Sequence, residues 1–154
     1  YESLSNFFHF LEKKFKTKVV IALNPKRSLI EAKKNFLNRS VFLNKTAHLI
    51  RNSKFSIIHT STALSYCVLS KKPVIFITNN DLKKSWFQRE IDFSALQLRN
   101  KVLNIDTLSK DININNYLII NRRYYKIYVN NYLYEKKIDK NVSLAKTLRL
   151  NFNK

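Results

Sequence analysis

A short polar segment, Asn24-Pro25-Lys26-Arg27, directly follows an apolar run and carries side chains suited to a phosphate group. The ammonium of Lys26 and the guanidinium of Arg27 could neutralise phosphate charge, and an arginine can give a phosphate two parallel hydrogen bonds. Asn24 and Pro25 are also typical of a plain turn at the end of a strand, and that simpler interpretation stays open. The segment is therefore a candidate anion site at a strand end.

A second polar segment, His59-Thr60-Ser61-Thr62, ends another apolar run. The hydroxyls of Ser61 and Thr62 could donate to a phosphate, and the backbone N–H groups of a following helix favour anions. The same hydroxyls suit a helix cap, because a side-chain oxygen there accepts from the free N–H groups of the first turn. Capping and phosphate binding can share one site. His59 could contact a ligand or simply end the strand.

These segments need a scaffold that presents strand ends to solvent. Residues 55–78 predict a strand, a helix and a second strand, because two apolar runs flank a stretch with helical spacing. The strands are apolar throughout, as parallel strands covered on both faces are. We therefore predict an α/β fold, a Rossmann-like three-layer α/β/α sandwich with a mostly parallel sheet of about five strands. Both polar segments would then share one carboxyl edge. The expected strands begin at Val19, Val41, Ser56, Val74 and Val102.

Amphipathic helices are expected around these strands. Residues 3–15 repeat apolar side chains at spacings of three and four, namely Leu4, Phe7, Phe8, Leu11 and Phe15. Ser28 and Glu31 have the spacing of a capping box for a helix to about residue 37. The remaining expected helices are 47–53 capped by Thr46, a segment from Asp81 anchored by Trp86 and Phe87, 92–99, and 143–151.

Residues 117–135 are rich in tyrosine and carry Arg122, Arg123 and Lys126. We interpret this segment as a long closing helix. Interleaved basic and aromatic residues could instead stack on nucleobases or lie on a membrane surface. The tyrosines expected to pack at a spacing of four are Tyr117, Tyr124, Tyr128 and Tyr132.

Composition narrows the function classes. The chain has 154 residues, about one domain, and no apolar run approaches the ~20 residues of a membrane span. It has no Gly, which excludes Gly-rich phosphate loops, and Cys67 is its single cysteine, which excludes a disulfide framework and a Cys-based zinc site. The net charge of +19 attracts polyanions, although a composition rich in Asn, Lys and Ile is also what AT-rich coding gives.

In this order the segments resemble a known family. Four successive segments resemble the C-terminal, donor-binding half of GT-B fold glycosyltransferases. They are the apolar run at 19–23 with Asn24-Pro25-Lys26-Arg27, then 46–54, 56–63 and 72–77. The likeness is strongest to sialyltransferase-like enzymes of capsule and lipopolysaccharide synthesis, and nucleotide-sugar 2-epimerases look similar. It covers residues 19–105. In sialyltransferase-like enzymes a His-Pro and a Ser-Ser or Ser-Thr contact the nucleotide; here Asn24 replaces the histidine.

The resemblance implies a nucleotide-sugar donor, a glycan or glycolipid acceptor and metal-independent transfer. The donor-binding residues would be Asn24, Pro25, Lys26, Arg27, Thr46, His59, Thr60, Ser61 and Thr62. Residues 1–154 would form one domain, the C-terminal half of a two-domain enzyme whose N-terminal domain holds the catalytic base. Glu90 and Asp92 are candidate bases by residue type only. We expect a cytoplasmic enzyme, with possible peripheral contact with the anionic inner membrane.

Two alternatives follow from other features. The net charge and the segment 117–135 also suit a basic nucleic-acid-binding module, although the lysines are spread along the chain and no nucleic-acid motif is present. The replacement at Asn24 also suits a catalytically inactive GT-B relative.

Overall fold

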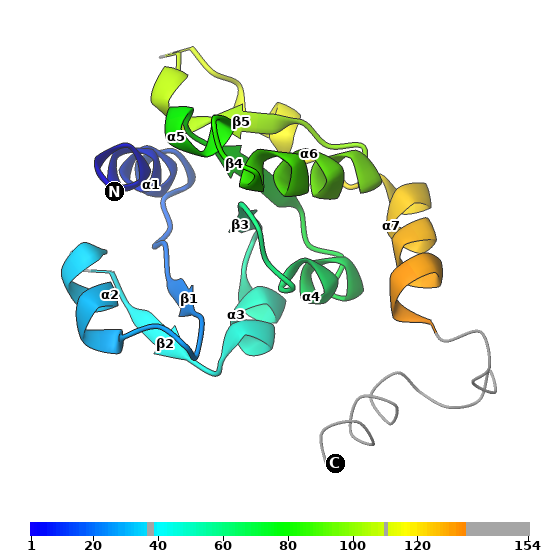
Figure 1. Ribbon diagram of the computed structural model, residues 1–154, viewed down its shortest axis with the longest axis horizontal. Helices are drawn as coiled ribbons and strands as arrows, with labels where there is room; N and C mark the ends of the chain where they lie inside the picture. The colour runs from blue at the N-terminus through cyan, green and yellow to red at the C-terminus, as the bar shows by residue number, and fades with distance from the viewer. Residues whose placement is uncertain (37–38, 110, 135–154) are drawn as a thin grey trace.

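The computed structural model describes residues 1–36, 39–109 and 111–134, and in them helices alternate with short parallel strands (Figure 1). The elements in chain order are α1 (Glu2–Phe15), β1 (Ile21–Leu23), α2 (Leu29–Asn35), β2 (Val41–Leu43), α3 (Thr46–Asn52), β3 (Ser56–Ile58), α4 (Leu64–Leu69), β4 (Val74–Thr78), α5 (Asn80–Lys83), α6 (Phe87–Gln97), β5 (Val102–Asn104), the 3₁₀ turns η1 (Ile105–Thr107) and η2 (Ile114–Tyr117), α7 (Arg122–Tyr128) and the π-helical turn η3 (Val129–Leu133). The predicted α/β class with parallel strands is confirmed.

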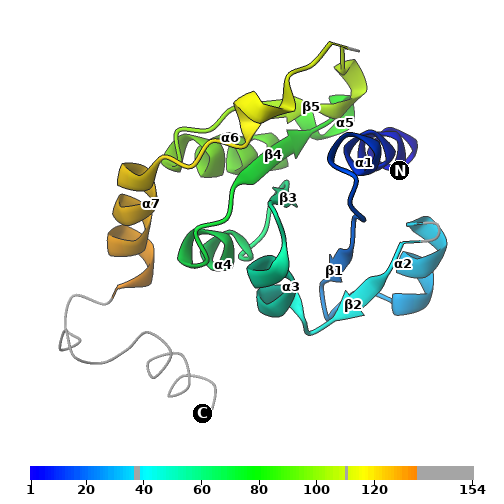
Figure 2. The same ribbon diagram turned by 180° about the vertical axis from the view of Figure 1, so that it is seen from behind.

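The strands form two sheets, so the prediction of one sheet of about five strands is wrong. β1 pairs in parallel with β2, with Leu23 opposite Leu43. β3, β4 and β5 form a separate parallel sheet with β4 in the middle. Figures 1 and 2 show the reason: α3 carries the chain upward from the end of β2 straight into β3. β3 therefore runs opposite to β2 and does not join its sheet as a parallel strand.

The central strand β4 organises the larger sheet. All of its residues, from Val74 to Thr78, are buried. Because side chains alternate across a strand, Val74 and Phe76 enter the cluster formed with α4, α6 and α7, whereas Ile75 and Ile77 enter the cluster formed with α1, η1 and η2. Helical elements therefore pack against both faces of this sheet.

Helix α1 closes the second of these clusters. Phe7, Phe8 and Leu11 are buried, and Leu4 and Phe15 pack beside them, as the apolar spacing predicts. Lys16 follows the helix with a left-handed backbone (φ 48°), and its N–H donates to the Glu12 carbonyl. The stripe predicted from sequence is therefore the face that α1 turns toward the sheet.

A polar contact joins α1 to the β1–β2 unit. Arg39 gives Glu12 two hydrogen bonds, at 3.0 and 2.9 Å, and its guanidinium lies 5.3 Å from the centre of the Phe8 ring. The backbone N–H of Val19 donates to the same carboxylate at 3.0 Å. Burial alone would raise the pKa of Glu12, but these hydrogen bonds and the charge of Arg39 outweigh it and hold that pKa below its ordinary value.

Several local predictions have a clear outcome. The Ser28 hydroxyl accepts the N–H of Glu31, so the predicted cap of α2 is confirmed. Thr46 is the first residue of α3 rather than its cap. Trp86 is 63% exposed and precedes α6, so its predicted role as an apolar anchor is wrong; Phe87, stacked against it, is also exposed.

The segment after residue 117 is not one long helix. It begins at the end of η2 and continues with a connection without regular structure, the short helix α7 and the wider turn η3. Of the tyrosines predicted to pack, Tyr128 is buried, while Tyr132 is exposed; Tyr125 is buried instead and its hydroxyl donates to the Lys72 carbonyl at 2.8 Å. The helix predicted over 143–151 lies outside the described residues.

No helix among the described residues is long and apolar enough to cross a membrane.

We predict that Glu12→Gln lowers the free energy of unfolding by about 1–3 kcal/mol, between the values of exposed and of buried ion pairs. The lowered pKa of Glu12 means that the carboxylate stabilises the fold fully above pH 4.5, and that this contribution is lost as the pH falls through the folded-state pKa. In urea unfolding, the free energies of unfolding of wild type and variant should converge as the pH falls below the folded-state pKa of Glu12.

Glu2→Gln is the matched control, because Glu2 is an exposed acid on the same helix. It should change the stability by less than about 0.5 kcal/mol. Equal losses in the two variants would contradict the role given to the contact between Glu12 and Arg39.

Candidate functional site

The first predicted polar segment forms a closed turn at the carboxyl end of β1. The Asn24 side-chain oxygen accepts the Lys26 N–H at 2.9 Å, and the Asn24 carbonyl accepts the Arg27 N–H at 2.9 Å. Asn24 is thus used in shaping the turn, as the simpler interpretation of the sequence holds. Because the turn is fixed by its own backbone, it leaves the side chains of Lys26 and Arg27 exposed to solvent.

The neighbouring strand brings a second polar group to the same edge. Leu23 and Leu43 are paired in parallel, so Asn24 and Asn44 both follow the last pair of the β1–β2 sheet. Asn44 has a left-handed backbone (φ 56°), a conformation that asparagine tolerates better than most residues, and it turns the chain into α3. Thr46, the first residue of α3, follows Asn44 by two positions.

A cavity of about 420 Å³ opens at this edge. Asn44, Lys45, Ala47 and His48 line it. The Lys45 ammonium lies 5.8 Å from the centre of the Phe42 ring, and the Asn52 amide donates to the His48 carbonyl at 2.9 Å. The described residues of the lining therefore offer an ammonium, an imidazole and an amide, and none of them is a carboxylate. This set suits an anionic ligand.

The second predicted segment forms a tight turn between β3 and α4. The Thr60 N–H donates to Nδ1 of His59 at 2.8 Å, and the Ser61 hydroxyl accepts the Ala63 N–H at 3.1 Å. The residue that precedes α4 is Ala63, which makes no side-chain cap, so Ser61 and Thr62 shape the turn before the helix rather than cap it. Ser61 and Thr62 are exposed.

His59 is held in one tautomer by this turn. An Nδ1 atom that accepts the Thr60 N–H carries no proton, so Nε2 carries it. Desolvation by the surrounding protein lowers the pKa of His59 below 6.5, although its side chain is exposed by surface area. The lowered pKa favours the neutral imidazole, which could offer a ligand one N–H group without positive charge.

The structure does not bring the two predicted segments to a common edge. The segment 24–27 follows β1 and Thr46 begins the helix after β2, whereas the segment 59–62 follows β3 of the other sheet. In Figures 1 and 2, β1 and β2 run downward while β4, parallel to β3, runs upward. The expectation of one carboxyl edge is therefore wrong, because it required one continuous sheet.

Sequence reasoning missed a third polar group, at the carboxyl ends of β4 and β5. The Asn80 N–H donates to the Asp106 carboxylate at 2.8 Å, and the Asn104 amide donates to the Asn80 side chain at 3.0 Å. The hydrogen bond from Asn80 is the largest cause that lowers the pKa of Asp106. The available signal was the asparagine and aspartate residues at the carboxyl ends of these two strands. These groups satisfy one another, so they stabilise the loop that joins β4 to α5.

The two acids considered as bases by residue type lie on α6. Asp92 accepts a hydrogen bond from Gln88 one helical turn away, at 2.7 Å, and Glu90 is exposed. Neither lies at a carboxyl edge of a sheet. Within residues 1–36, 39–109 and 111–134, no group of three or more His, Cys, Asp or Glu side chains could hold a metal ion.

Comparisons with known proteins give no match: no protein-family model, no curated protein and no solved structure resembles the chain significantly.

We predict that His59 titrates below pH 6.5 in the folded protein and returns to the ordinary value of 6.5 in urea. The measurement is a pH titration of the imidazole signals by NMR, with His59→Asn used to assign the resonance. A folded-state pKa above 6.5 would show that the ring is protonated against a nearby anion, and would contradict the neutral tautomer described above.

Proposed function

We propose that this chain binds the phosphates of a nucleotide-sugar at the carboxyl edge of the β1–β2 sheet. The cavity of about 420 Å³ lined by Lys45 and His48 is the observation that carries the proposal. Ligands of α/β folds bind outside the carboxyl ends of parallel strands, and the volume falls within the ~300–1,000 Å³ of small-molecule sites.

Charge at this edge supports an anionic ligand. Lys26 and Arg27 follow β1 and Lys45 follows β2, so cations flank the edge from both strands. Arg27 can bind a phosphate through two parallel hydrogen bonds, and Lys45 can act as a point charge. Such cations would stabilise a departing nucleotide phosphate without proton transfer, which is what glycosyl transfer from a nucleotide-sugar requires.

The finer assignment rests on the sequence resemblance. We propose the donor-binding domain, Rossmann-like in type, of a GT-B glycosyltransferase that transfers a sugar to a surface-glycan acceptor such as a capsule or lipopolysaccharide precursor. The acceptor site and the catalytic base would belong to a second domain. A net charge of +19 favours contact with anionic membrane, where a glycolipid acceptor would be presented.

We predict that the protein binds one of UDP, CDP, GDP or CMP selectively, as measured by calorimetry in moderate salt. Arg27→Ala and Lys45→Ala should each weaken that binding about tenfold, the effect of losing one charge-assisted hydrogen bond. Ser61→Ala should change it by less than threefold, because Ser61 follows a strand of the other sheet.

Lys101→Ala is the matched control for charge, since Lys101 is an exposed lysine just before β5. If it weakens binding as much as Lys45→Ala, the ligand responds only to net charge. Binding lost in Ser61→Ala and kept in Arg27→Ala would move the phosphate site to the turn after β3. No binding of any nucleotide would overturn the proposal.

The same titrations separate the nucleic-acid alternative. A short oligonucleotide that binds more tightly than any mononucleotide, with affinity falling steeply as salt rises, would favour a basic nucleic-acid-binding module. A glycosyltransferase donor site predicts the opposite order of affinities.

A further inference from the structure

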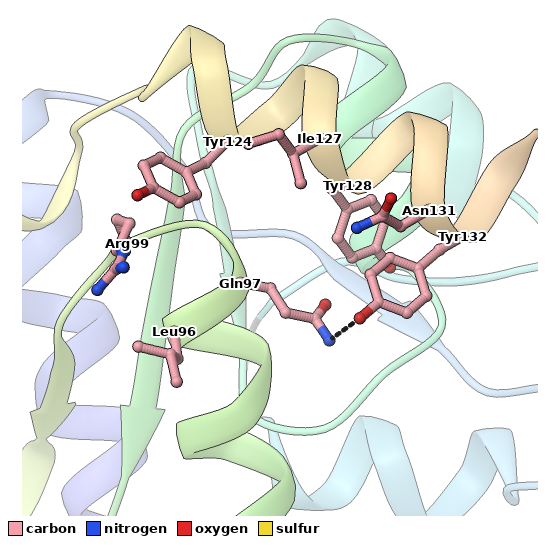
Figure 3. A pocket seen from close by; sticks show the side chains of 8 residues that line it. All are labelled: Leu96, Gln97, Arg99, Tyr124, Ile127, Tyr128, Asn131 and Tyr132. Atoms are coloured by element: carbon pink, nitrogen blue, oxygen red, sulfur yellow. Dashed lines mark hydrogen bonds between the residues drawn. The ribbon is translucent and has the colours of Figure 1, made fainter.

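A second cavity lies between α6 and the segment formed by α7 and η3, away from the β1–β2 edge described above. Its volume is about 290 Å³. Figure 3 shows the rings of Tyr124, Tyr128 and Tyr132 along one side, contributed by α7 and η3, and Leu96, Gln97 and Arg99 opposite them. Ile127 and Asn131 complete the lining.

The tyrosines are held as a fixed platform. Tyr128 is 9% exposed and its hydroxyl lies 3.3 Å from that of Ser65, so it forms the floor. The Tyr132 ring lies 5.0 Å from the Tyr128 ring, and its hydroxyl accepts a hydrogen bond from the Gln97 amide at 3.0 Å. Tyr132 is thus oriented by two contacts while remaining 53% exposed. Such a ring is ordered before any ligand arrives, which reduces the entropy cost of binding.

Polar groups surround this platform on its rim. The Arg99 guanidinium lies 5.1 Å from the centre of the Tyr124 ring, and the amides of Gln97 and Asn131 lie near the other tyrosines. An amide offers both donors and acceptors, and a guanidinium offers only donors. None of the described residues that line the cavity carries a carboxylate, and Arg99 makes the charge of this lining positive. The arrangement combines an apolar face with hydrogen-bonding groups at its edge.

We propose that this cavity binds one acidic sugar residue of a glycan, independently of the nucleotide site proposed above. The C–H face of a pyranose ring is weakly positive and suits the negative face of an aromatic ring, while its hydroxyls point outward to planar amides. A carboxylate on the sugar pairs with the guanidinium of Arg99. The volume is at the lower limit of the ~300–1,000 Å³ of ligand pockets, so it accepts a single ring and not a nucleotide. The π-helical turn η3 fits this role, because such turns recur at functional sites.

The test compares two probes that differ in one group, methyl β-glucuronide and methyl β-glucoside. NMR titration of the full chain should shift the side-chain amide signals of Gln97 and Asn131, with the glucuronide binding several-fold more tightly. Tyr132→Ala should weaken both sugars about tenfold. Arg99→Gln should weaken only the glucuronide, to the affinity of the glucoside.

Tyr134→Ala is the matched control, because Tyr134 is 57% exposed, lies two residues further along and does not line the cavity. It should leave both affinities unchanged. Adenosine and cytidine are included as probes because nucleobases also stack on tyrosine rings. Failure of both sugars to bind, tighter binding of a nucleoside at the same amides, or equal loss in Tyr134→Ala would each overturn the proposal. The nucleotide titrations above do not depend on this result.

Discussion

Burial of β4 on both faces is the constraint on which the larger part of the molecule depends. A strand alternates its side chains, so Val74 and Phe76 require an apolar layer on one face and Ile75 and Ile77 require one on the other. Helices α4, α6 and α7 supply the first layer, and α1 with η1 and η2 supplies the second. The only buried polar side chain of this strand, Thr78, donates to Gln88 at 2.6 Å and so carries no unpaired hydroxyl.

The β1–β2 unit is attached to that core by a different kind of contact. Ile21 of β1 and Phe36, which follows α2, pack partly against the α1 cluster, and the ion pair of Glu12 and Arg39 adds a polar contact to α1. The pair is partly buried, with Arg39 11% and Glu12 23% exposed, so water screens it less than a surface pair. The edge that carries Lys26, Arg27 and Lys45 therefore depends on a contact that acid weakens.

The two proposed sites use different physics. At the β1–β2 edge, Lys45 lines an open cavity and Lys26 and Arg27 follow the neighbouring strand, and this positive charge favours a phosphate. Between α6 and the segment formed by α7 and η3, tyrosine rings provide an apolar surface with amides at the rim. A nucleotide-sugar and a glycan differ in the same way, since one is defined by charge and the other by ring faces and hydroxyls. The two sites would allow one domain to hold both kinds of molecule.

The sequence by itself determined what depends on neighbours within a turn or along a strand. The apolar stripe of α1, the Ser28 cap of α2, the five strand positions and the alternation of strands with helices all follow from such local patterns. Each involves residues within four positions of one another, or one strand's own composition, so spacing and residue type are sufficient.

Only the tertiary structure decided how the strands group and which strand ends meet. The sequence pattern does not show that α3 leads into β3 without a reversal of chain direction. It therefore does not show that Asn24 and His59 follow strands of different sheets. The same limit hid the tyrosine cavity, because Gln97 and Tyr132 are 35 positions apart and meet only where η3 lies beside the end of α6. Long-range packing, which no local spacing encodes, determines which of these side chains lie close together.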